Sequence, residues 1–167
     1  MHSKVVEAKI FSSVESLFHT LNQWRFSQKK VVFTNGCFDI LHLGHIDYLT
    51  KAADKGDILV IGLNSDRSVS EIKGNKRPIN NETSRAHVLA SLAFVKAVVL
   101  FDEPTPYELI KFIQPDVLVK GADYKIEEIV GFEIVKAKGG EITTLDFLSG
   151  YSTSGIEQKI VENHSKS

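Results

Sequence analysis

The sequence predicts an α/β fold in which a doubly wound parallel sheet of about five strands carries helices on both faces. Segments with the character of strands alternate with segments of helical spacing along almost the whole chain. The strand-like segments are continuous apolar runs, which are typical of strands buried on both faces of a sheet. No internal repeat or low-complexity segment interrupts the alternation, so we expect one sheet.

Five short segments rich in Val, Ile, Leu, Thr or Phe are expected to form the strands. They cover residues 31–34, 57–64, 97–101, 116–120 and 141–145. Polar or glycine-containing sequence follows four of them, after Thr34, Asn64, Lys120 and Leu145. Ligands of open parallel sheets bind beyond the carboxyl ends of the strands, so we expect the active site at that edge.

Helices are expected before, between and after these strands. They cover residues 14–25, 43–55, 82–94, 105–114, 127–138 with a break at Gly131, and 152–161. Pro115 cannot continue the fourth of these helices. Residues 65–78 are polar and basic and contain Gly74 and Pro78, which predicts a loop with at most one helical turn.

The length of 167 residues fits a single domain. Residues 30–167 are expected to form this main domain. Residues 1–29 are expected to be an N-terminal helical extension packed on it. The apolar face of that extension would consist of Val14, Leu17, Phe18 and Leu21.

The composition excludes several classes of protein. The formal net charge is −1, with 20 basic and 21 acidic residues, which gives no broad basic surface for nucleic acid or an anionic membrane. The single cysteine, Cys37, excludes an internal disulfide. No apolar run approaches the ~20 residues of a membrane span, and residues 1–11 lack the apolar block of a signal peptide. We therefore expect a cytoplasmic protein that binds neither nucleic acid nor membrane.

The strongest chemical signal is the segment 34–45, between the first strand and the first long helix. The helix begins near Gly44, so its free N–H groups face the carboxyl edge of the sheet, an arrangement that suits phosphate. His42 and His45 are three residues apart and share one side of the first turn. Two imidazoles there can hold a triphosphate and stabilise charge that develops in its transition state. Gly36 allows a tight turn or close approach of a ligand.

A pair of histidines three residues apart is, taken alone, more often structural or part of a metal site. A zinc site would need further ligands at suitable spacing. The other histidines, His2, His19, His87 and His164, fall in unrelated segments. The context therefore favours phosphate binding, and Cys37 is expected to be a small packing residue of the same loop.

The segment His42-Leu43-Gly44-His45, after Phe38-Asp39, resembles the HxGH signature of the nucleotidyltransferase superfamily, whose fold is Rossmann-like. Tyr151-Ser152-Thr153-Ser154 is similar to a second superfamily element, the STT-like turn that opens the last helix. Across roughly residues 30–161 the chain looks like the adenylyltransferase domain of bacterial heptose enzymes. The segments that carry this likeness are 35–45, 64–66, 73–78, Arg85, 118–124, 139–141 and 150–153.

The resemblance implies a role for each matching residue. The catalytic residues would be His42, His45 and Lys73. The nucleotide would be bound by Asn35, Gly36, Cys37, Phe38, Asp39, Gly44, Asp66, Ser152, Thr153 and Ser154. The second substrate would be met by Arg77, Arg85, Lys120 and Asp123. Without the family, Lys73 reads as a solvated charge, Ser152 as a plain N-cap and Arg85 as a charge on a helix surface.

The implied reaction is transfer of AMP from ATP to a sugar 1-phosphate, D-glycero-β-D-manno-heptose 1-phosphate, which makes residues 30–167 a nucleotidyltransferase domain. Mg²⁺ is expected as cofactor, bound mainly through the ATP phosphates, with Asp39 as the nearest carboxylate and no protein metal site. The fused ribokinase-like domain of many relatives is not seen in this sequence, which implies a separate heptose kinase in the same pathway.

The chain differs from cytidylyltransferases at two places, and both differences bear on whether it uses ATP or CTP. Many cytidylyltransferases have an Arg shortly before the STT-like turn, whereas residues 141–155 contain neither Lys nor Arg. Glycerol-phosphate cytidylyltransferases carry a basic contact after the third strand, where this chain has Asp102-Glu103. ATP is therefore expected over CTP. The alternatives are a cytidylyltransferase for a polyol or amino-alcohol phosphate and a non-catalytic nucleotide-binding sensor.

A homodimer with its ligand loops near the interface is also expected. The run 94–101 is apolar and follows a helix with Leu89, Ala90, Leu92 and Ala93 on more than one face. One face can cover the sheet, which leaves apolar surface for a second copy. The alternative is that the N-terminal helix covers this surplus through Leu17, Phe18 and Leu21.

Overall fold

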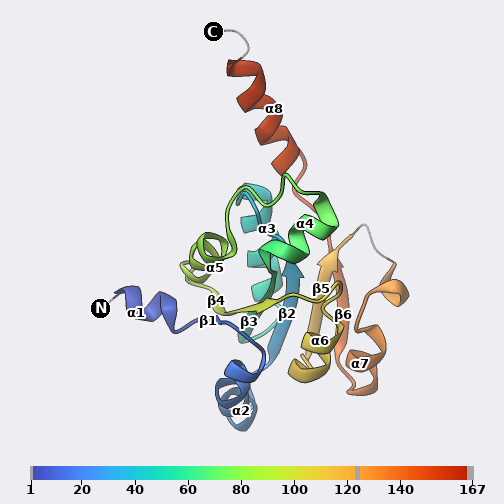
Figure 1. Ribbon diagram of the computed structural model, residues 1–167. Coiled ribbons are helices and arrows are strands. Elements are labelled where there is room, and N and C mark those ends of the chain that lie inside the picture. The colour runs from blue at the N-terminus through green and yellow to red at the C-terminus, as the bar shows by residue number, and fades with distance from the viewer. Residues whose placement is uncertain (1, 123–124, 165–167) are drawn as a thin grey trace.

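An all-parallel sheet of six strands lies at the centre of the computed structural model, which describes residues 2–122 and 125–164 (Figure 1). The strand order is β1-β4-β3-β2-β5-β6. The strands are β1 (Ile10–Phe11), β2 (Val31–Gly36), β3 (Ile58–Asn64), β4 (Val95–Phe101), β5 (Val117–Gly121) and β6 (Glu141–Leu145). The predicted α/β class and all five predicted strands are confirmed.

The sixth strand, β1, was not predicted from the sequence. It follows helix α1 (His2–Glu7) and pairs in parallel with β4, with Ile10 opposite Val98 and Phe11 opposite Val99. Two residues are too few to show the pattern of a strand. The N-terminal extension is thus joined to the main sheet by backbone hydrogen bonds as well as by side-chain packing.

Helices cover both faces of the sheet, as predicted. On one face α3 (Leu43–Ala53) and α5 (Glu82–Ala90) pack against the strands through Leu49, Ala52 and Leu89. The other face is covered by η1 (Glu15–Leu17), α2 (Phe18–Phe26), α6 (Tyr107–Ile113) and α7 (Phe132–Ala137). A short helix, η2 (Ile126–Glu128), precedes α7. Helix α8 (Thr153–His164) projects beyond the carboxyl ends of the strands, at the top of Figure 1.

The segment 65–78 corrects the sequence prediction, because it holds α4 (Asp66–Lys73), two helical turns where at most one was expected. Ser65 caps this helix by accepting a hydrogen bond from the backbone N–H of Ser68. The inward side of α4 carries Val69 and the polar Ser68, which accepts a hydrogen bond from the buried Asn64 amide. The helix carries only two apolar residues, Val69 and the exposed Ile72, so its sequence reads as polar throughout.

The apolar surplus that suggested a dimer is partly covered within the chain. Val6 and Ile10, from α1 and β1, pack against the same cluster as Leu89 and Ala90 of α5. Leu17 and Leu21 are buried, but in the cluster on the opposite face of the sheet. The N-terminal extension therefore covers this surface through residues other than those the sequence suggested.

Among the described residues, no helix is both long enough and apolar enough to span a lipid bilayer.

Candidate active site

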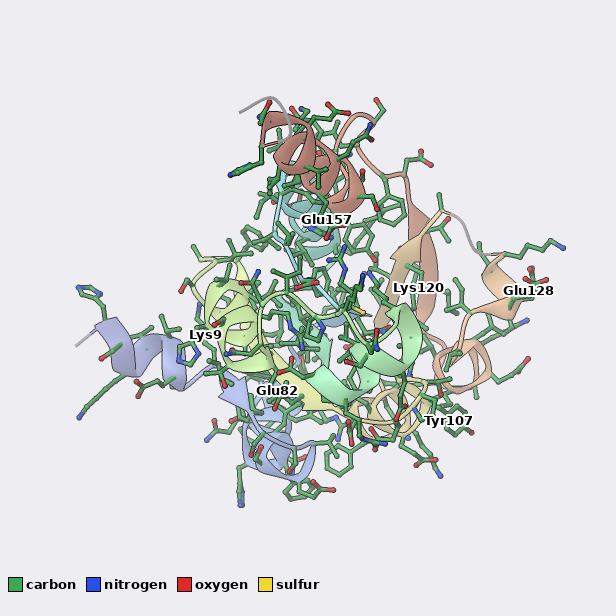
Figure 2. All side chains as sticks on the ribbon, turned by 45° about the horizontal axis from the view of Figure 1, so that its top comes forward. Lys9, Glu82, Tyr107, Lys120, Glu128 and Glu157 are labelled. Carbon is green, nitrogen blue, oxygen red and sulfur yellow. The ribbon has the colours of Figure 1, made fainter. Side chains whose placement is uncertain are left out.

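The candidate site lies where the strand order reverses. Chain order runs outward from β2 through β3 to β4, and then resumes on the other side of β2 with β5 and β6. Parallel sheets bind ligands at such a switch point, beyond the carboxyl ends of the strands. Asn35 and Gly36 end β2 there, and Lys120 lies at the end of the neighbouring β5. Figure 2 tilts this edge toward the reader and labels Lys120 on β5 and Glu157 on α8.

The two predicted histidines occupy the first turn of α3 and lie together. His42 is the N-cap residue, and its Nδ1 accepts a hydrogen bond from the backbone N–H of His45 at 3.4 Å. In a neutral imidazole whose Nδ1 accepts, the proton sits on Nε2, which is then a donor. The rings of His42 and His45 stack with centroids 3.8 Å apart and planes 22° apart.

Both imidazoles are held in the neutral form. Burial lowers the pKa of His42. Burial, followed by the charges of His42 and Lys73, lowers the pKa of His45 to about 4, while a hydrogen bond with the backbone of Ile40 acts in the opposite direction. The pair can therefore offer N–H groups to a polyphosphate at neutral pH without an imidazolium. His45 Nδ1 is also buried without a hydrogen-bond partner among the described residues.

The N-terminus of α8 lies beside that of α3, and the lack of a side chain at Gly44 makes this close approach possible. A Cβ atom on Gly44 would lie 3.1 Å from the His42 ring and 3.1 Å from Cβ of Tyr151. The glycine between the two histidines thus lets the turn before α8 approach the first turn of α3. Two helix N-termini are thereby brought to one place, which favours binding of an anion.

Ser152 occupies the N-cap position of α8. Its Oγ accepts a hydrogen bond from the backbone N–H of Gly155 at 3.0 Å. The capping role that the residue type alone suggested is therefore present. Thr153 and Ser154 lie in the first turn, where N–H groups lack intrahelical partners.

Asp39 and Arg77 hold the loop that carries the histidines. The Asp39 carboxylate, only 4% exposed, accepts hydrogen bonds from the backbone N–H groups of Ile79 and Asn80 and from Nη1 of Arg77 at 2.8 Å. Burial alone would raise the pKa of Asp39, but these hydrogen bonds and the Arg77 charge outweigh it and lower the pKa. Nη2 of Arg77 forms an ion pair with Glu157 of α8. One guanidinium thus links the α3 entry loop to α8.

Arg85 lies behind the site and is 2% exposed, so it is not a charge on a helix surface. Its guanidinium donates to the carbonyls of Asn80 and Cys37 and to Oδ1 of Asp66 at 2.7 Å. These three acceptors belong to three separate segments of the site. Arg85 therefore fixes their relative positions from within the protein.

Lys73 is the last residue of α4 and is exposed, where the sequence placed it in a loop. Its charge is close enough to act on the pKa of both His45 and Cys37. Burial raises the pKa of the Cys37 thiol despite the nearby Lys73 and Arg85 cations. The thiol is therefore protonated at neutral pH, which supports the packing role. Phe38 is buried beside it, and a Cβ on Gly36 would lie 3.0 Å from its ring.

Lys120 forms the other side of the site. Its Nζ donates a hydrogen bond to Oδ1 of Asn35 across the β2–β5 boundary, and burial lowers its pKa to about 8. Lys120 lines a cavity of about 230 Å³ at the carboxyl edge of the sheet. Asn35, Asn64, Thr105, Glu128 and Ile129 also line this cavity. Another cavity, of about 400 Å³, lies at the opposite edge of the sheet and is not part of this site. Asp123 lies outside the described residues.

No group of three or more His, Cys, Asp or Glu side chains within residues 2–122 and 125–164 could hold a metal ion. The Asp39 carboxylate already accepts hydrogen bonds from three residues, Arg77, Ile79 and Asn80.

The sequence analysis did not single out Phe147 or Glu157 and gave Asn64 no role of its own, although the fold brings all three to the site or its rim. Asn64 is buried and lines the Lys120 cavity, and its position at the end of a predicted strand was the available signal. Glu157 lies one turn into α8, where nothing in the sequence points to Arg77.

A family model described as cytidylyltransferase-like matches residues 33–159. The bifunctional protein HldE of Citrifermentans bemidjiense is 51% identical over 162 residues, which are 97% of this chain and 33% of that protein. The bifunctional protein HldE of Campylobacter concisus is 57% identical over 148 residues, which are 89% of this chain and 30% of that protein. The chain thus spans about a third of the length of the curated relatives that it matches.

Two solved structures are similar in fold. A lipopolysaccharide core biosynthesis protein from Thermoplasma volcanium has a TM-score of 0.56 and 29% identity, over 74% of this chain and 99% of that one. A pantoate-beta-alanine ligase from Francisella tularensis, complexed with beta-gamma ATP and beta-alanine, has a TM-score of 0.59 over 92% of this chain and 77% of that one. Its 18% identity supports the fold alone.

Proposed function

Because the chain belongs to the cytidylyltransferase-like family, we propose that it transfers AMP from ATP to a sugar 1-phosphate. The proposed acceptor is D-glycero-β-D-manno-heptose 1-phosphate, and the products are ADP-heptose and pyrophosphate. The observation that carries the proposal is the meeting of two helix N-termini beside the stacked rings of His42 and His45. The identity of 51% to a bifunctional HldE protein supports the heptose acceptor.

In the proposed reaction an oxygen of the sugar 1-phosphate attacks the α-phosphorus of ATP and pyrophosphate leaves in line. The nucleophile is already an anion, so neither a strong base nor a covalent intermediate is needed. Catalysis is then alignment and stabilisation of charge on the phosphate oxygens. His42, His45 and Lys73 would supply that stabilisation, and Ser152, Thr153 and Ser154 would hold the triphosphate at the α8 N-terminus.

The acceptor is proposed to enter from the Lys120 side. Lys120 and Asn35 lie on strands β5 and β2, next to a cavity of about 230 Å³ that polar and apolar residues line together. A lysine whose ammonium is disfavoured by burial gains from an anion beside it, because the anion stabilises the charged form. The phosphate of the acceptor is such an anion, and Asp123 is proposed to contact the same substrate.

Eight of the predicted binding residues are proposed to act by fixing or shaping the loops of the site. Asp39 and Arg77 fix the loop before α3, while Arg85 ties Asp66 to the carbonyl of Cys37. Gly36, Cys37, Phe38 and Gly44 shape the backbone around the phosphates. Each of these residues therefore affects the reaction by setting the positions of the donors.

Mg²⁺ is proposed as the cofactor, and when bound it would neutralise charge on the phosphates of the nucleotide. The described residues offer no cluster of three ligands for it. Asp39 would have to give up hydrogen bonds to reach it, so the protein's own contribution is to place the phosphates.

We further propose that the protein works in the cytoplasm as a homodimer. The rival functions are a cytidylyltransferase for a polyol or amino-alcohol phosphate and a non-catalytic nucleotide sensor. Pyrophosphate release, measured with ATP and with CTP against a panel of sugar 1-phosphates, separates all three. ATP with the heptose 1-phosphate should be the best pair. Equal or faster release with CTP would contradict the nucleotide assignment, and no release with any pair would favour the sensor.

A further inference from the structure

Phe147 presents an aromatic ring that is exposed and yet held in place. It lies in the loop between β6 and α8, and the residue is 53% exposed. A Cβ atom on Gly121, at the end of β5, would lie 2.3 Å from Cζ of this ring. The ring also lies against Tyr48, with centroids 5.7 Å apart and planes 31° apart.

Tyr48 in turn is fixed within the core. It is 5% exposed, and its hydroxyl shares a hydrogen bond of 2.8 Å with the hydroxyl of Thr34 on β2. The Phe147 ring therefore rests on rigid groups on one side and meets solvent on the other. A ring with one supported face and one free face is a platform on which a flat group can stack.

The position of the platform relates it to the phosphate donors. Phe147 lies between the end of β5 and the N-terminus of α8, five residues before Ser152. Tyr151, next to Ser152, touches the first turn of α3 through its Cβ beside Gly44. A nucleotide whose phosphates lie at the two helix N-termini can therefore extend its base along this loop toward Phe147.

We propose that Phe147 stacks on the adenine base of ATP and helps to select it, an inference that rests on ATP being the donor in the proposed function. A purine covers more of a ring than a pyrimidine does. The segment 141–155 contains no Lys or Arg, so at this point the loop offers an aromatic surface and no cation. Leu43 and Tyr151 at the helix N-termini are also exposed, so an interface between two copies is the competing use of Phe147.

The test compares Phe147→Leu, Phe147→Ala and Phe147→Trp, with binding of ATP, CTP and inorganic tripolyphosphate measured by calorimetry. Leu keeps most of the packing against Gly121 and Tyr48 but removes the aromatic face. Stacking on one base is large enough that Leu and Ala should weaken ATP binding roughly tenfold or more. Trp keeps an aromatic face, so its affinity for ATP should stay within about threefold of that of the wild type, less than the loss expected when stacking on a base is removed. Binding of tripolyphosphate, which has no base, should be unchanged in every variant.

Phe26→Leu is the matched control, because Phe26 on α2 is exposed on the opposite side of the fold. Equal loss of ATP and tripolyphosphate binding in Phe147→Leu would overturn the proposal, as would unchanged ATP binding. Dissociation of a dimer with ATP binding intact would assign Phe147 to an interface and also overturn it. If the wild type binds ATP through Phe147 yet releases no pyrophosphate with any sugar 1-phosphate, the proposed function fails and the stacking role stands.

Discussion

Arg77 donates from Nη1 to Oδ2 of Asp39 at 2.8 Å, although 38 residues separate the two in the chain. The carboxylate is nearly inaccessible and also accepts two backbone N–H groups of residues 79 and 80. The loop that carries the histidines therefore depends on one buried charge that is fully hydrogen-bonded.

Replacing Asp39 by Ala should lower the free energy of unfolding by about 2–4 kcal/mol, since it leaves a half-buried guanidinium and two backbone N–H groups without their acceptor. Urea denaturation measures the change. Asp54→Ala, at an exposed position after α3, serves as control and should change stability by less than about 0.5 kcal/mol. A loss of stability no larger than that of the control would refute the role given to Asp39.

Glu157→Gln should weaken ATP binding roughly three- to tenfold, because it removes the charged partner through which Arg77 holds α8. The free energy of unfolding should change little, since α8 buries no residue. Glu162→Gln, on the same helix but bonded only to Gln158 in the described structure, is the matched control. Equal ATP affinity in the two variants would show that α8 is held by other contacts.

His42→Ala and His45→Ala should each reduce turnover by about 10²–10³-fold, the scale for loss of one charge-stabilising donor. His42 also caps α3, so His42→Asn separates the two roles of this residue, because Asn preserves an N-cap but lacks the imidazole. All three proteins should fold, which circular dichroism checks. Near-normal turnover in a folded His variant would remove that residue from the mechanism.

The KM for the sugar 1-phosphate should rise as the pH increases from 7 to 9.5. Burial lowers the pKa of Lys120 to about 8, so the ammonium that is proposed to meet the acceptor loses its proton in this window. Lys120→Arg keeps its charge and should flatten the profile. A KM that is constant across this range in the wild type would exclude Lys120 from acceptor binding.

The same group should make the folded protein more stable as the pH rises, although it weakens acceptor binding. Between about pH 8 and the ordinary lysine pKa, Lys120 holds its proton in the unfolded chain but not in the folded one. The free energy of unfolding therefore increases with pH in this window.

The homodimer is the fifth prediction, and light scattering at micromolar concentration tests it. Val6 and Ile10 cover part of the apolar surface that first suggested it, so a dimer would have to use another surface, such as the exposed Leu43 and Tyr151 beside the site. A mass near 18.6 kDa, that of one chain, would leave the dimer without support.

The sequence predicted those elements whose structure follows from the types and spacing of neighbouring residues. Strands such as β3 are continuous apolar runs, and α3 begins at Leu43, one residue from the predicted start near Gly44, so both could be placed from residue type and spacing. Arg85 could not be placed in this way. Its acceptor on Cys37 is 48 residues away, and an arginine on a helix reads as a surface charge until the fold buries it.

The remaining differences have similar causes. Helix α4 was missed because it carries only two apolar residues, Val69 and Ile72, among polar and charged ones. The strand β1 was missed because two residues show no periodicity. Phe147 was passed over because one aromatic residue in a loop has no signal until Gly121 and Tyr48 are seen to support it.

The pairing of β1 with β4 has a consequence for how the chain avoids self-association. β4 is seven residues long and mostly buried apolar side chains, with Lys96 as its one charged residue. Left at the edge of the sheet, it would offer a row of unpaired backbone groups to any other strand. The two residues of β1, preceded by a helix, cover the middle of that edge at Val98 and Val99 and so interrupt the row of free backbone groups. A chain shortened to begin at Lys30 should therefore keep its site residues and yet be prone to aggregate through β4.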